Sequence, residues 1–317
     1  MTATPSRKRR PSWFKRFWAI VRYEMLWNIR KKKFIGIIAA VFVIATLILV
    51  LPPVLSRSSG VAIKANPYYA ITFGGTGFLF LLFAIGTSVN SISSEFESGS
   101  IVPLITKPVS RTMIFLGKLF GAFVILLVSY IVLYGYITIA SVVVYGPQKD
   151  LQYMPIIVVG SMVSTLIWVS IMFAVGSISK NTIMTVIMAI ILFLAFFFAA
   201  PLIGEFYGPS PTLNYFPGTG ASGTIFVANG TSVGSGTDNI GVNIVNYALY
   251  SSANVTYFKT NVTALTSGNA SAITTNIVAY TESTAFVAIR SLAIAAGYIA
   301  SFLAVAWVAL KRSQILE

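Results

Sequence analysis

Long apolar stretches alternate with short polar segments along the chain. A helix needs roughly 20 consecutive apolar residues to cross the hydrocarbon layer of a membrane. Six stretches reach that length without a charged residue, namely residues 34–55, 68–89, 119–144, 154–177, 183–203 and 291–310. The pattern predicts an all-α polytopic membrane protein with six transmembrane helices.

Prolines among these stretches mark expected helix ends, because proline lacks the backbone N–H that continues a helix. Pro52 and Pro53 lie where we expect the first span to end, and Pro201 lies where we expect the fifth to break. Pro155 falls in the expected first turn of the fourth span, where proline is tolerated. The sequence therefore predicts that the first and fifth helices stop close to these prolines.

A further helix is predicted directly before the first span, over residues 13–29. Ser12 can cap it, since a serine hydroxyl accepts from the free backbone N–H groups of a first helical turn. At about 100° per residue the apolar side chains share one stripe, which comprises Phe14, Phe17, Trp18, Val21, Met25 and Ile29. The cations gather on the other side, at Lys15, Arg16, Arg22 and Arg30. Such a helix lies in the headgroup layer, and the sequence leaves open whether it only anchors the chain or braces the first span as an elbow.

The composition fits a chain that is mostly surrounded by lipid. Hydrophobic residues make up 56% of the 317 residues and charged residues 9%, against about 25% charged residues in soluble domains. The chain has no cysteine and no histidine, which excludes disulfides, thiolate metal sites, cysteine nucleophiles and the commonest general base. The composition therefore argues against an enzyme active site.

The net charge of +14 follows the expected membrane topology. Cationic loops stay in the cytoplasm, and with an inside N-terminus that side holds seventeen Lys and Arg residues, eleven of them within the first 33 residues. The outside holds four, at Arg57, Lys64, Lys149 and Lys259, with Arg290 at the outer boundary of the last span. We therefore expect both termini in the cytoplasm and no nucleic-acid partner.

The segment between the second and third spans, residues 94–118, combines a short apolar stretch with charges on both sides. Ser98 or Ser100 can cap a short helix that ends before Pro108, and carboxylates at Glu95 and Glu97 are favoured beside a helix N-terminus. Such a helix exposes a small apolar surface formed by Ile101, Val102, Leu104 and Ile105. This surface suits a groove on a soluble partner, and a tight turn tucked against the membrane helices fits the composition equally well.

The same segment resembles a known family. The sequences EFESGSI at 95–101, KPVSR at 107–111 and GK at 117–118 are similar to the coupling-helix region of type-2 ATP-binding-cassette (ABC) transporter permeases, and the basic stretch at 22–33 resembles their elbow helix. In that family the loop docks on a separate ATPase subunit, and two permease chains enclose the translocation path. The resemblance implies a homo- or heterodimer, and an ABC ATPase partner that contacts Glu95, Glu97, Ser98, Gly99, Ile101, Val102, Leu104, Ile105 and Arg111.

The chain carries no sequence signature of ATP hydrolysis. Gly117 and Lys118 lack the upstream glycine of a phosphate-binding loop. All eight acidic residues fall outside the expected spans, whereas a proton- or cation-driven transporter usually keeps a carboxylate within the membrane. We therefore expect a transporter subunit, not an enzyme, which binds no cofactor or metal itself and whose partner subunit binds ATP and Mg.

Residues 204–283, between the last two spans, form the largest polar segment. Half of its 80 residues are Gly, Ser, Thr or Asn, and β-prone stretches at 224–227, 254–258 and 273–280 alternate with turn residues. This pattern predicts a small, mostly β extracellular cap, with a partly disordered loop as the alternative. N-glycosylation sequons occur only in this segment, at Asn229, Asn254, Asn261 and Asn269, as expected for a segment outside the cell.

The predicted organisation is a basic tail and elbow helix at 1–33, five spans at 34–203, the outer domain at 204–283, and the last span with a cytoplasmic tail at 284–317. The preferred hypothesis is a plasma-membrane permease of an ABC exporter, and a separate permease with N-glycosylation sequons suggests an archaeon. Hydroxyls, amides and aromatic rings in the spans suit a lipid-like, amphipathic or glycosylated substrate, and they serve equally as contacts between helices. The rival hypothesis is a membrane-anchored binding or scaffolding protein that displays the outer domain.

Overall fold

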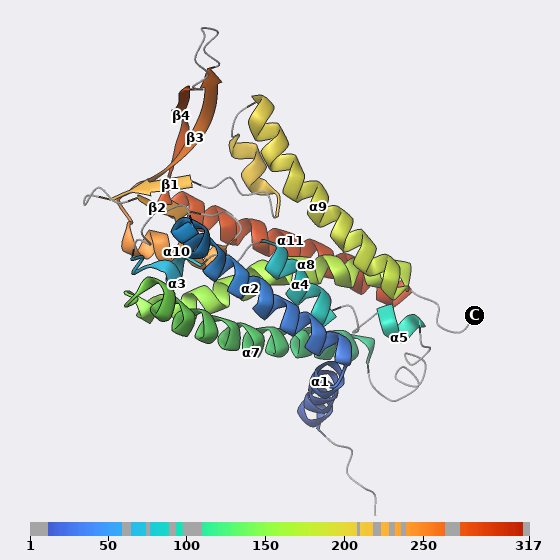
Figure 1. Ribbon diagram of the computed structural model, residues 1–317. Coiled ribbons are helices and arrows are strands. Elements are labelled where there is room, and N and C mark those ends of the chain that lie inside the picture. Colours follow the sequence, from blue (N-terminus) through green and yellow to red (C-terminus); the bar gives the residue numbers. More distant parts are fainter. Residues whose placement is uncertain are drawn as a thin grey trace, which may run out of the picture.

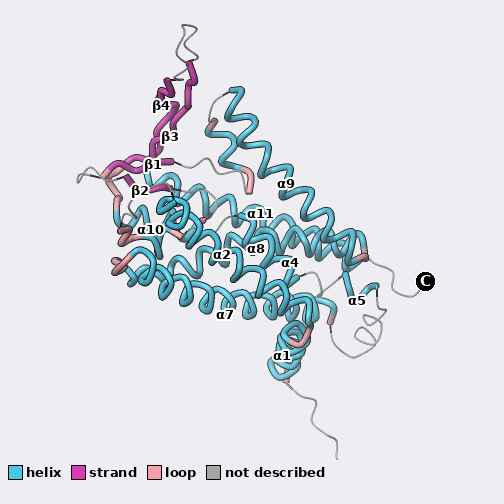
Figure 2. The backbone as a smooth tube through the Cα atoms, in the orientation of Figure 1, coloured by secondary structure: helices cyan, strands magenta, loops and turns pink. Residues whose placement is uncertain are grey.

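The structure is a computed structural model that describes residues 12–58, 65–73, 77–88, 93–97, 110–207, 210–217, 223–227, 232–235, 239–263 and 273–312. Within these ranges the chain is mostly helical, and six helices are long and apolar enough to cross a membrane. They form a bundle with a small β-sheet at one end (Figures 1 and 2). The predicted polytopic architecture is thus confirmed.

Helices occupy all of the predicted spans. The first, third, fourth, fifth and sixth spans correspond to α2 (Lys32–Ser58), α7 (Arg111–Tyr145), α8 (Met154–Ser179), α9 (Thr182–Tyr207) and α11 (Thr284–Arg312). The second span begins with the short helix α3 (Tyr69–Thr72) and continues as α4 (Gly77–Ser88). After α4, the short helix α5 (Ser93–Glu97) leads into the loop at 98–109, which lies outside the described residues.

The helix α1 (Trp13–Ile29) precedes α2, and Ser12 caps it by accepting a hydrogen bond from a first-turn backbone N–H at 3.4 Å. Its packed face differs from the predicted apolar stripe. The buried residues of α1 are Val21, Glu24 and Asn28, so the helix turns two polar side chains toward the bundle. Three members of the predicted stripe are exposed instead, namely Phe14, Trp18 and Ile29.

The helix α8 forms the centre of the bundle, where it packs against α4, α7, α9 and α11. Hydroxyl pairs join it to α7: Tyr130 Oη lies 2.5 Å from Thr165 Oγ1, and Tyr134 Oη lies 2.7 Å from Ser161 Oγ. All four side chains are buried. These polar residues therefore act as contacts between helices within one chain.

The prediction that α2 ends at its prolines is wrong, because the helix continues through Pro52 and Pro53 to Ser58. Each proline leaves the carbonyl four residues earlier without its usual donor. The Tyr145 hydroxyl donates to the Leu49 carbonyl at 2.9 Å, and the Tyr69 hydroxyl donates to the Ile48 carbonyl at 3.3 Å. The two tyrosine rings stack with their centroids 4.1 Å apart. This tyrosine pair supplies the donors that the prolines lack.

The helix α9 likewise passes the proline at which it was expected to break. It runs through Pro201 to Tyr207. Proline has a φ compatible with a helix, so the helix can continue past Pro201 although the backbone hydrogen bond of that residue is lost. The predicted end of the fifth helix is therefore also wrong.

The sheet contains four antiparallel strands in the order β2-β1-β3-β4. Three strands match the β-prone stretches, namely β1 (Gly223–Phe226), β3 (Asn254–Thr263) and β4 (Ile273–Ser283). The strand β2 (Ser232–Ser235) and the short 3-10 helix η2 (Pro211–Tyr215) were not predicted. Among the sequons, Asn254 is exposed at the start of β3 and Asn261 lies later in β3, whereas Asn229 and Asn269 lie outside the described residues.

The helix α10 (Ile240–Leu249), between β2 and β3, was also missed by the sequence analysis. It packs against α8 and α11. A Cβ atom added to Gly160 of α8 would lie 2.1 Å from the Gly241 backbone nitrogen of α10, so only glycines permit this approach. The segment between the last two spans is therefore packed into the end of the bundle.

The strand β4 continues without a break into α11. Thr284, the first residue of α11, donates its backbone N–H to the Ala253 carbonyl at 3.3 Å. One turn and a half further on, Arg290 forms a buried ion pair with Glu282 of β4. The guanidinium group lies over the rings of Tyr215 and Phe286, 5.8 and 5.3 Å from their centroids. Arg290 thus fixes the sheet to the last helix.

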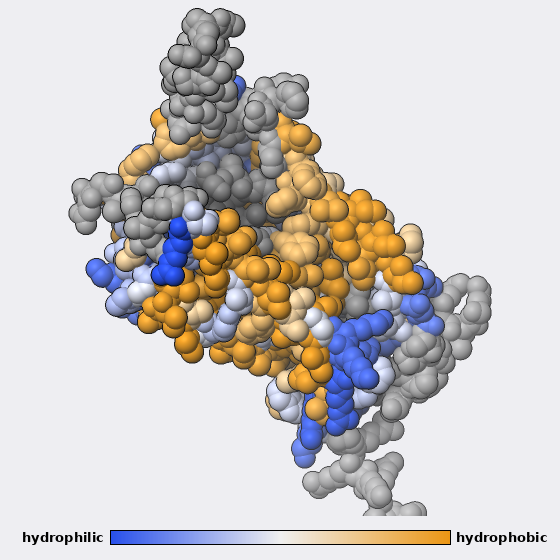
Figure 3. Space-filling view, viewed as in Figure 1, coloured by the Kyte–Doolittle hydropathy of each residue, from blue (hydrophilic) through white to orange (hydrophobic). Residues whose placement is uncertain are grey.

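The two ends of the bundle differ in polarity. We call the end that carries α1 and the start of α2 the basic end, and the end that carries the strands the sheet end. Figure 3 shows hydrophobic side chains covering the middle of the bundle, a cluster of hydrophilic side chains at the basic end and further hydrophilic side chains at the sheet end. This distribution is typical of a helical bundle that spans a membrane.

Candidate functional site: the junction of α1, α5 and α7

The predicted docking residues divide into described and undescribed sets. Ser98, Gly99, Ile101, Val102, Leu104 and Ile105 lie outside the described residues. Glu95 and Glu97 lie in α5, and Arg111 begins α7. The structure therefore describes the two segments that enter and leave the 98–109 loop, which we call the loop roots: α5 and the first two turns of α7.

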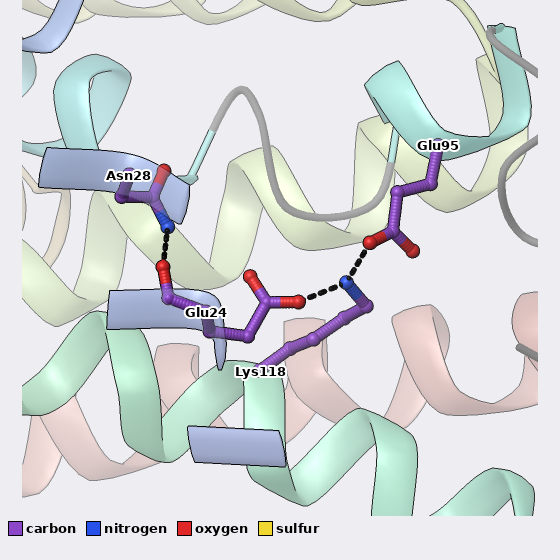
Figure 4. A network of polar contacts seen from close by, with 4 residues as sticks. All are labelled: Glu24, Asn28, Glu95 and Lys118. Atoms are coloured by element: carbon purple, nitrogen blue, oxygen red, sulfur yellow. Dashed lines mark hydrogen bonds and ion pairs between the residues drawn. The ribbon is translucent and has the colours of Figure 1, made fainter. Parts of the chain in front are cut away.

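One buried lysine joins both loop roots to α1. Lys118 Nζ lies 2.5 Å from Glu24 Oε1 of α1 and 2.6 Å from Glu95 Oε1 of α5 (Figure 4). The lysine, Glu24 and Glu95 side chains are 3%, 2% and 8% exposed. Asn28, one turn after Glu24, donates its amide to the Glu24 carbonyl at 3.0 Å. Three segments far apart in sequence therefore meet at a single ammonium group.

Two glycines allow α1 to approach α7 closely enough for this contact. A Cβ atom at Gly117 would lie 2.6 Å from Ile20 Cγ2, and a Cβ atom at Gly121 would lie 2.9 Å from Glu24 Cβ. Small residues four apart are the usual means by which membrane helices come into close contact. Lys118 follows the first of these glycines, so the crossing places its side chain beside Glu24.

The buried negative charges of the junction outnumber the buried positive charge that pairs with them. Two carboxylates share one ammonium group, and Glu24 Oε2 and Glu95 Oε2 have no hydrogen-bond partner within the described part of the chain. Lys31, between α1 and α2, is the next cation: burial lowers the pKa of its ammonium group, while Glu24 and Glu95 oppose that shift. Buried charges are costly unless paired, so the three paired side chains depend on one another.

Further hydrogen bonds extend from the loop roots to the remaining helix ends. Glu97 Oε2 accepts from the Thr182 backbone N–H at 3.1 Å, at the first residue of α9. Arg111 Nη1 donates to the Lys311 carbonyl at 2.9 Å, in the last turn of α11. The loop roots are thereby attached to α1, α9 and α11. This arrangement can transmit a displacement of the loop to several helices at once.

Sequence reasoning found only part of the junction. It selected Glu95, and it considered Lys118 only beside Gly117, as part of a phosphate-binding loop that the sequence does not contain. It did not pair Lys118 with Glu24, which is 94 positions away. A usable signal was present, because Gly117 and Gly121 form a small-xxx-small pattern and Glu24 interrupts an otherwise basic helix. Arg111 and Glu97 were selected as docking residues, and the structure places both in contacts with helix ends.

A search of curated proteins finds no match to this chain. A family model described as ABC-2 family transporter protein matches residues 18–315, which include α1, the junction and all six long helices. The match agrees with the resemblance noted in the loop and in the basic stretch before the first span. Permeases of this kind cross the membrane and work with a separate ABC ATPase. The chain belongs to the ABC-2 family of transporter permeases.

Proposed function

We propose that this permease is the membrane-spanning subunit of an ABC exporter and that residues 98–109 dock on its ATPase subunit. The single observation that carries the proposal is the Lys118 junction, in which one buried lysine pairs with Glu95 at the loop and Glu24 in the elbow helix. The predicted docking surface on the loop comprises Ile101, Val102, Leu104 and Ile105. Ser98 and Gly99 begin this segment, and Glu97 and Arg111 flank it.

The mechanism follows from the contacts around the loop. ATP and Mg bind in the partner, and closure of two ATPase subunits displaces the docked loops. Because Lys118 pairs with Glu24 and Glu95, the loop roots and α1 move together. The contacts from Glu97 to α9 and from Arg111 to α11 carry the displacement to two further helices. The binding energy of the partner is thereby converted into a change of helix packing.

The remaining parts of the proposal concern orientation and substrate. Both termini and the basic end face the cytoplasm of an archaeal cell, and the sheet end faces outward with its sequons at Asn229, Asn254, Asn261 and Asn269. Two permease chains, identical or related, enclose the path. The substrate is lipid-like, amphipathic or glycosylated, in keeping with spans that offer hydroxyls and aromatic rings.

The docking proposal is tested by copurification of the ATPase subunit with the full chain. We expect Ile101→Asp and Val102→Asp to remove ATPase binding and transport, because a carboxylate disfavours burial in an apolar groove. Ile277→Asp is the matched control, since Ile277 is an exposed aliphatic residue of β4 at the sheet end. It should leave ATPase binding unchanged. Retained ATPase binding in both loop variants would overturn the proposal.

A further inference from the structure

The junction of α1, α5 and α7 contains one more carboxyl group than ammonium groups. Lys118 Nζ contacts Glu24 Oε1 and Glu95 Oε1, so one oxygen of each carboxyl group is engaged. The second oxygens, Glu24 Oε2 and Glu95 Oε2, are buried and have no hydrogen-bond partner within the described ranges. If both carboxyl groups are ionised, one negative charge stays uncompensated. A buried group in that position normally becomes neutral by taking up a proton.

Two further cations, Lys31 and Lys33, lie where α1 leads into α2. Lys31 Nζ lies over the Trp27 ring, 4.5 Å from its centroid, and Lys33 is exposed. Within the described residues, the ion pairs of Glu24 and Glu95 are those with Lys118. Water screens charges at the protein surface. These two lysines therefore compensate the buried carboxyl groups only in part.

The helices α8 and α9 also pack against α5. Lys180 lies at the turn between them, where it is exposed and its Nζ lies 5.6 Å from the centroid of the Phe96 ring. On α5 itself, Glu97 is exposed and accepts from the Thr182 backbone N–H. These contacts direct the charges of Lys180 and Glu97 toward other partners, so the surplus charge of the junction remains.

The geometry favours a proton over a metal ion as the balancing charge. Figure 4 shows the uncontacted oxygen of Glu24 and that of Glu95 on opposite sides of the Lys118 ammonium group. A metal ion needs several oxygen ligands around one point, whereas a proton needs one oxygen. Among the described residues, no group of three acidic, histidine or cysteine side chains could hold a metal. A proton balances the charge without any rearrangement.

Glu95 is the carboxyl group that we assign to this proton. It lies in α5, beyond the end of α4, and burial raises the pKa of its carboxyl group, an effect that Lys118 opposes. With the proton on Oε2, Oε1 still accepts from Lys118, and the ionised Glu24 pairs one-to-one with the ammonium group. We propose that Glu95 is a carboxylic acid at neutral pH, so that the junction holds one proton in addition to the Lys118 ammonium group.

The proton makes the attachment of α5 to α1 and α7 depend on pH. Ionisation of Glu95 at higher pH places a second negative charge in the buried site, so α5 separates more readily. Conversely, a movement that brings Glu95 into water releases the proton, because the hydrated group has a pKa of about 4.3. The protonation itself does not require the ATPase, and only this consequence for movement of the loop rests on the proposed function.

Infrared spectroscopy of the purified full chain at neutral pH tests the proposal, because a protonated carboxyl group has a C=O stretching band that ionised carboxylates lack. We expect this band in the wild type and its loss in Glu95→Gln. Glutamine has the shape of the protonated acid, so the contact with Lys118 is retained. Glu97→Gln is the matched control on the same helix. The hydrogen bond from Thr182 lowers the pKa of the Glu97 carboxyl group, so this variant should keep the band.

The variant Glu24→Gln separates surplus charge from burial as the cause of the protonation. It leaves one carboxyl group for one ammonium group. Glu95 should then ionise, and the band should disappear although Glu95 is still present.

Unfolding at different pH values gives an independent measurement. In the unfolded chain Glu95 ionises with a pKa of about 4.3, whereas the folded chain keeps the proton. Its contribution to stability is therefore complete below about pH 4 and decreases as the pH rises. From about pH 5 to pH 7, the equilibrium constant of unfolding should increase about ten-fold per pH unit in the wild type relative to Glu95→Gln.

Three outcomes would overturn the inference. They are the absence of a protonated carboxyl band in the wild type, its persistence in Glu95→Gln, and its persistence in Glu24→Gln. None of these measurements involves the ATPase, so a failure here is distinct from a failure of the docking proposal.

Discussion

At the scale of single residues, Pro52 and Pro53 lie inside a membrane-spanning helix and leave two carbonyls without backbone donors. The hydroxyls of Tyr145 and Tyr69 donate to these carbonyls. A buried carbonyl left without a donor costs about 1–3 kcal/mol. The tyrosine pair therefore allows α2 to keep its length in spite of the prolines.

We predict that Tyr145→Phe lowers the free energy of unfolding by about 1–2 kcal/mol, because it leaves the Leu49 carbonyl unsatisfied. In a Pro53→Ala background the backbone N–H of residue 53 can reach that carbonyl, so the same substitution should cost much less. Thermal unfolding in detergent measures both costs in a double-mutant cycle. Tyr23→Phe, at an exposed tyrosine of α1, is the control.

An equal cost of Tyr145→Phe with and without Pro53 would contradict this account. It would mean that the tyrosine acts through its ring packing alone. The ring is retained in phenylalanine and still stacks on Tyr69, so the cycle separates the hydroxyl from the ring.

At the scale of elements, the crossing of α1 over α7 determines the geometry of the junction. Glu24 reaches Lys118 only because Gly117 and Gly121 bring the two helix backbones together. A side chain at either glycine must displace α1. The ion pair and the crossing therefore support one another.

We predict that Gly121→Ala destabilises the protein by about 1–3 kcal/mol, the usual cost of overpacking, because its Cβ would lie 2.9 Å from Glu24 Cβ. Gly135→Ala on the same helix is the control, since nothing lies within 4 Å of a Cβ atom there. Alanine is the better helix former, so Gly135→Ala should be neutral or slightly stabilising. Equal effects of the two substitutions on the unfolding temperature would argue against a close crossing.

A second element-scale prediction concerns the buried charges. Lys118→Met leaves Glu24 and Glu95 buried without their cation, and we expect a loss of about 3–5 kcal/mol. Adding Glu24→Gln and Glu95→Gln removes the uncompensated charges and should restore most of that stability. Unfolding in denaturant or by heat, followed by circular dichroism, measures both variants. If the triple variant is no more stable than Lys118→Met, the uncompensated charges of Glu24 and Glu95 are not the cause of the lost stability.

The elements predicted well from sequence are those whose signal is local. Six spans follow from uninterrupted apolar runs, and three strands follow from β-prone stretches that are separated by turn residues. Pro52 and Pro53 were misread because their replacement donors, Tyr145 and Tyr69, come from other segments. The pairing of Glu24 with Lys118 was missed for the same reason. The helix α10 was missed because its asparagines and Gly241 resemble a turn-rich segment until α8 and α11 cover them.

At the scale of the whole molecule, the segment between the last two spans is part of the bundle. Its helix α10 packs on α8 and α11, and the Ile240 backbone N–H donates to Ser164 Oγ of α8 at 3.3 Å. Removing this segment would uncover the sheet end of both helices. The match to a family of transporter permeases, and not this packing, speaks against the rival hypothesis of a scaffolding protein that displays the segment.

We predict that Gly160→Ala separates α10 from α8, because the added Cβ would meet backbone atoms of Gly241 that cannot rotate away. The sheet end should become accessible to protease, while the junction at the basic end stays intact. Limited proteolysis, with cleavage between residues 204 and 283 as the readout, measures the effect. Gly36→Ala is the control, since nothing lies within 4 Å of its Cβ position. Unchanged protection in Gly160→Ala would contradict the packing of α10.

Because β4 continues directly into α11, we expect the hairpin of β3 and β4 to move together with that helix. The strand β3 of this hairpin contains 10 residues. At about 3.3 Å per residue, the hairpin therefore extends about 30 Å beyond the start of α11. Since Arg290 and Thr284 fix strand to helix, tilting the helix by about 5° swings the far tip of the hairpin by roughly 3 Å. A spectroscopic label near that tip would therefore report a tilt of α11, including any tilt that the proposed ATPase subunit causes at the basic end.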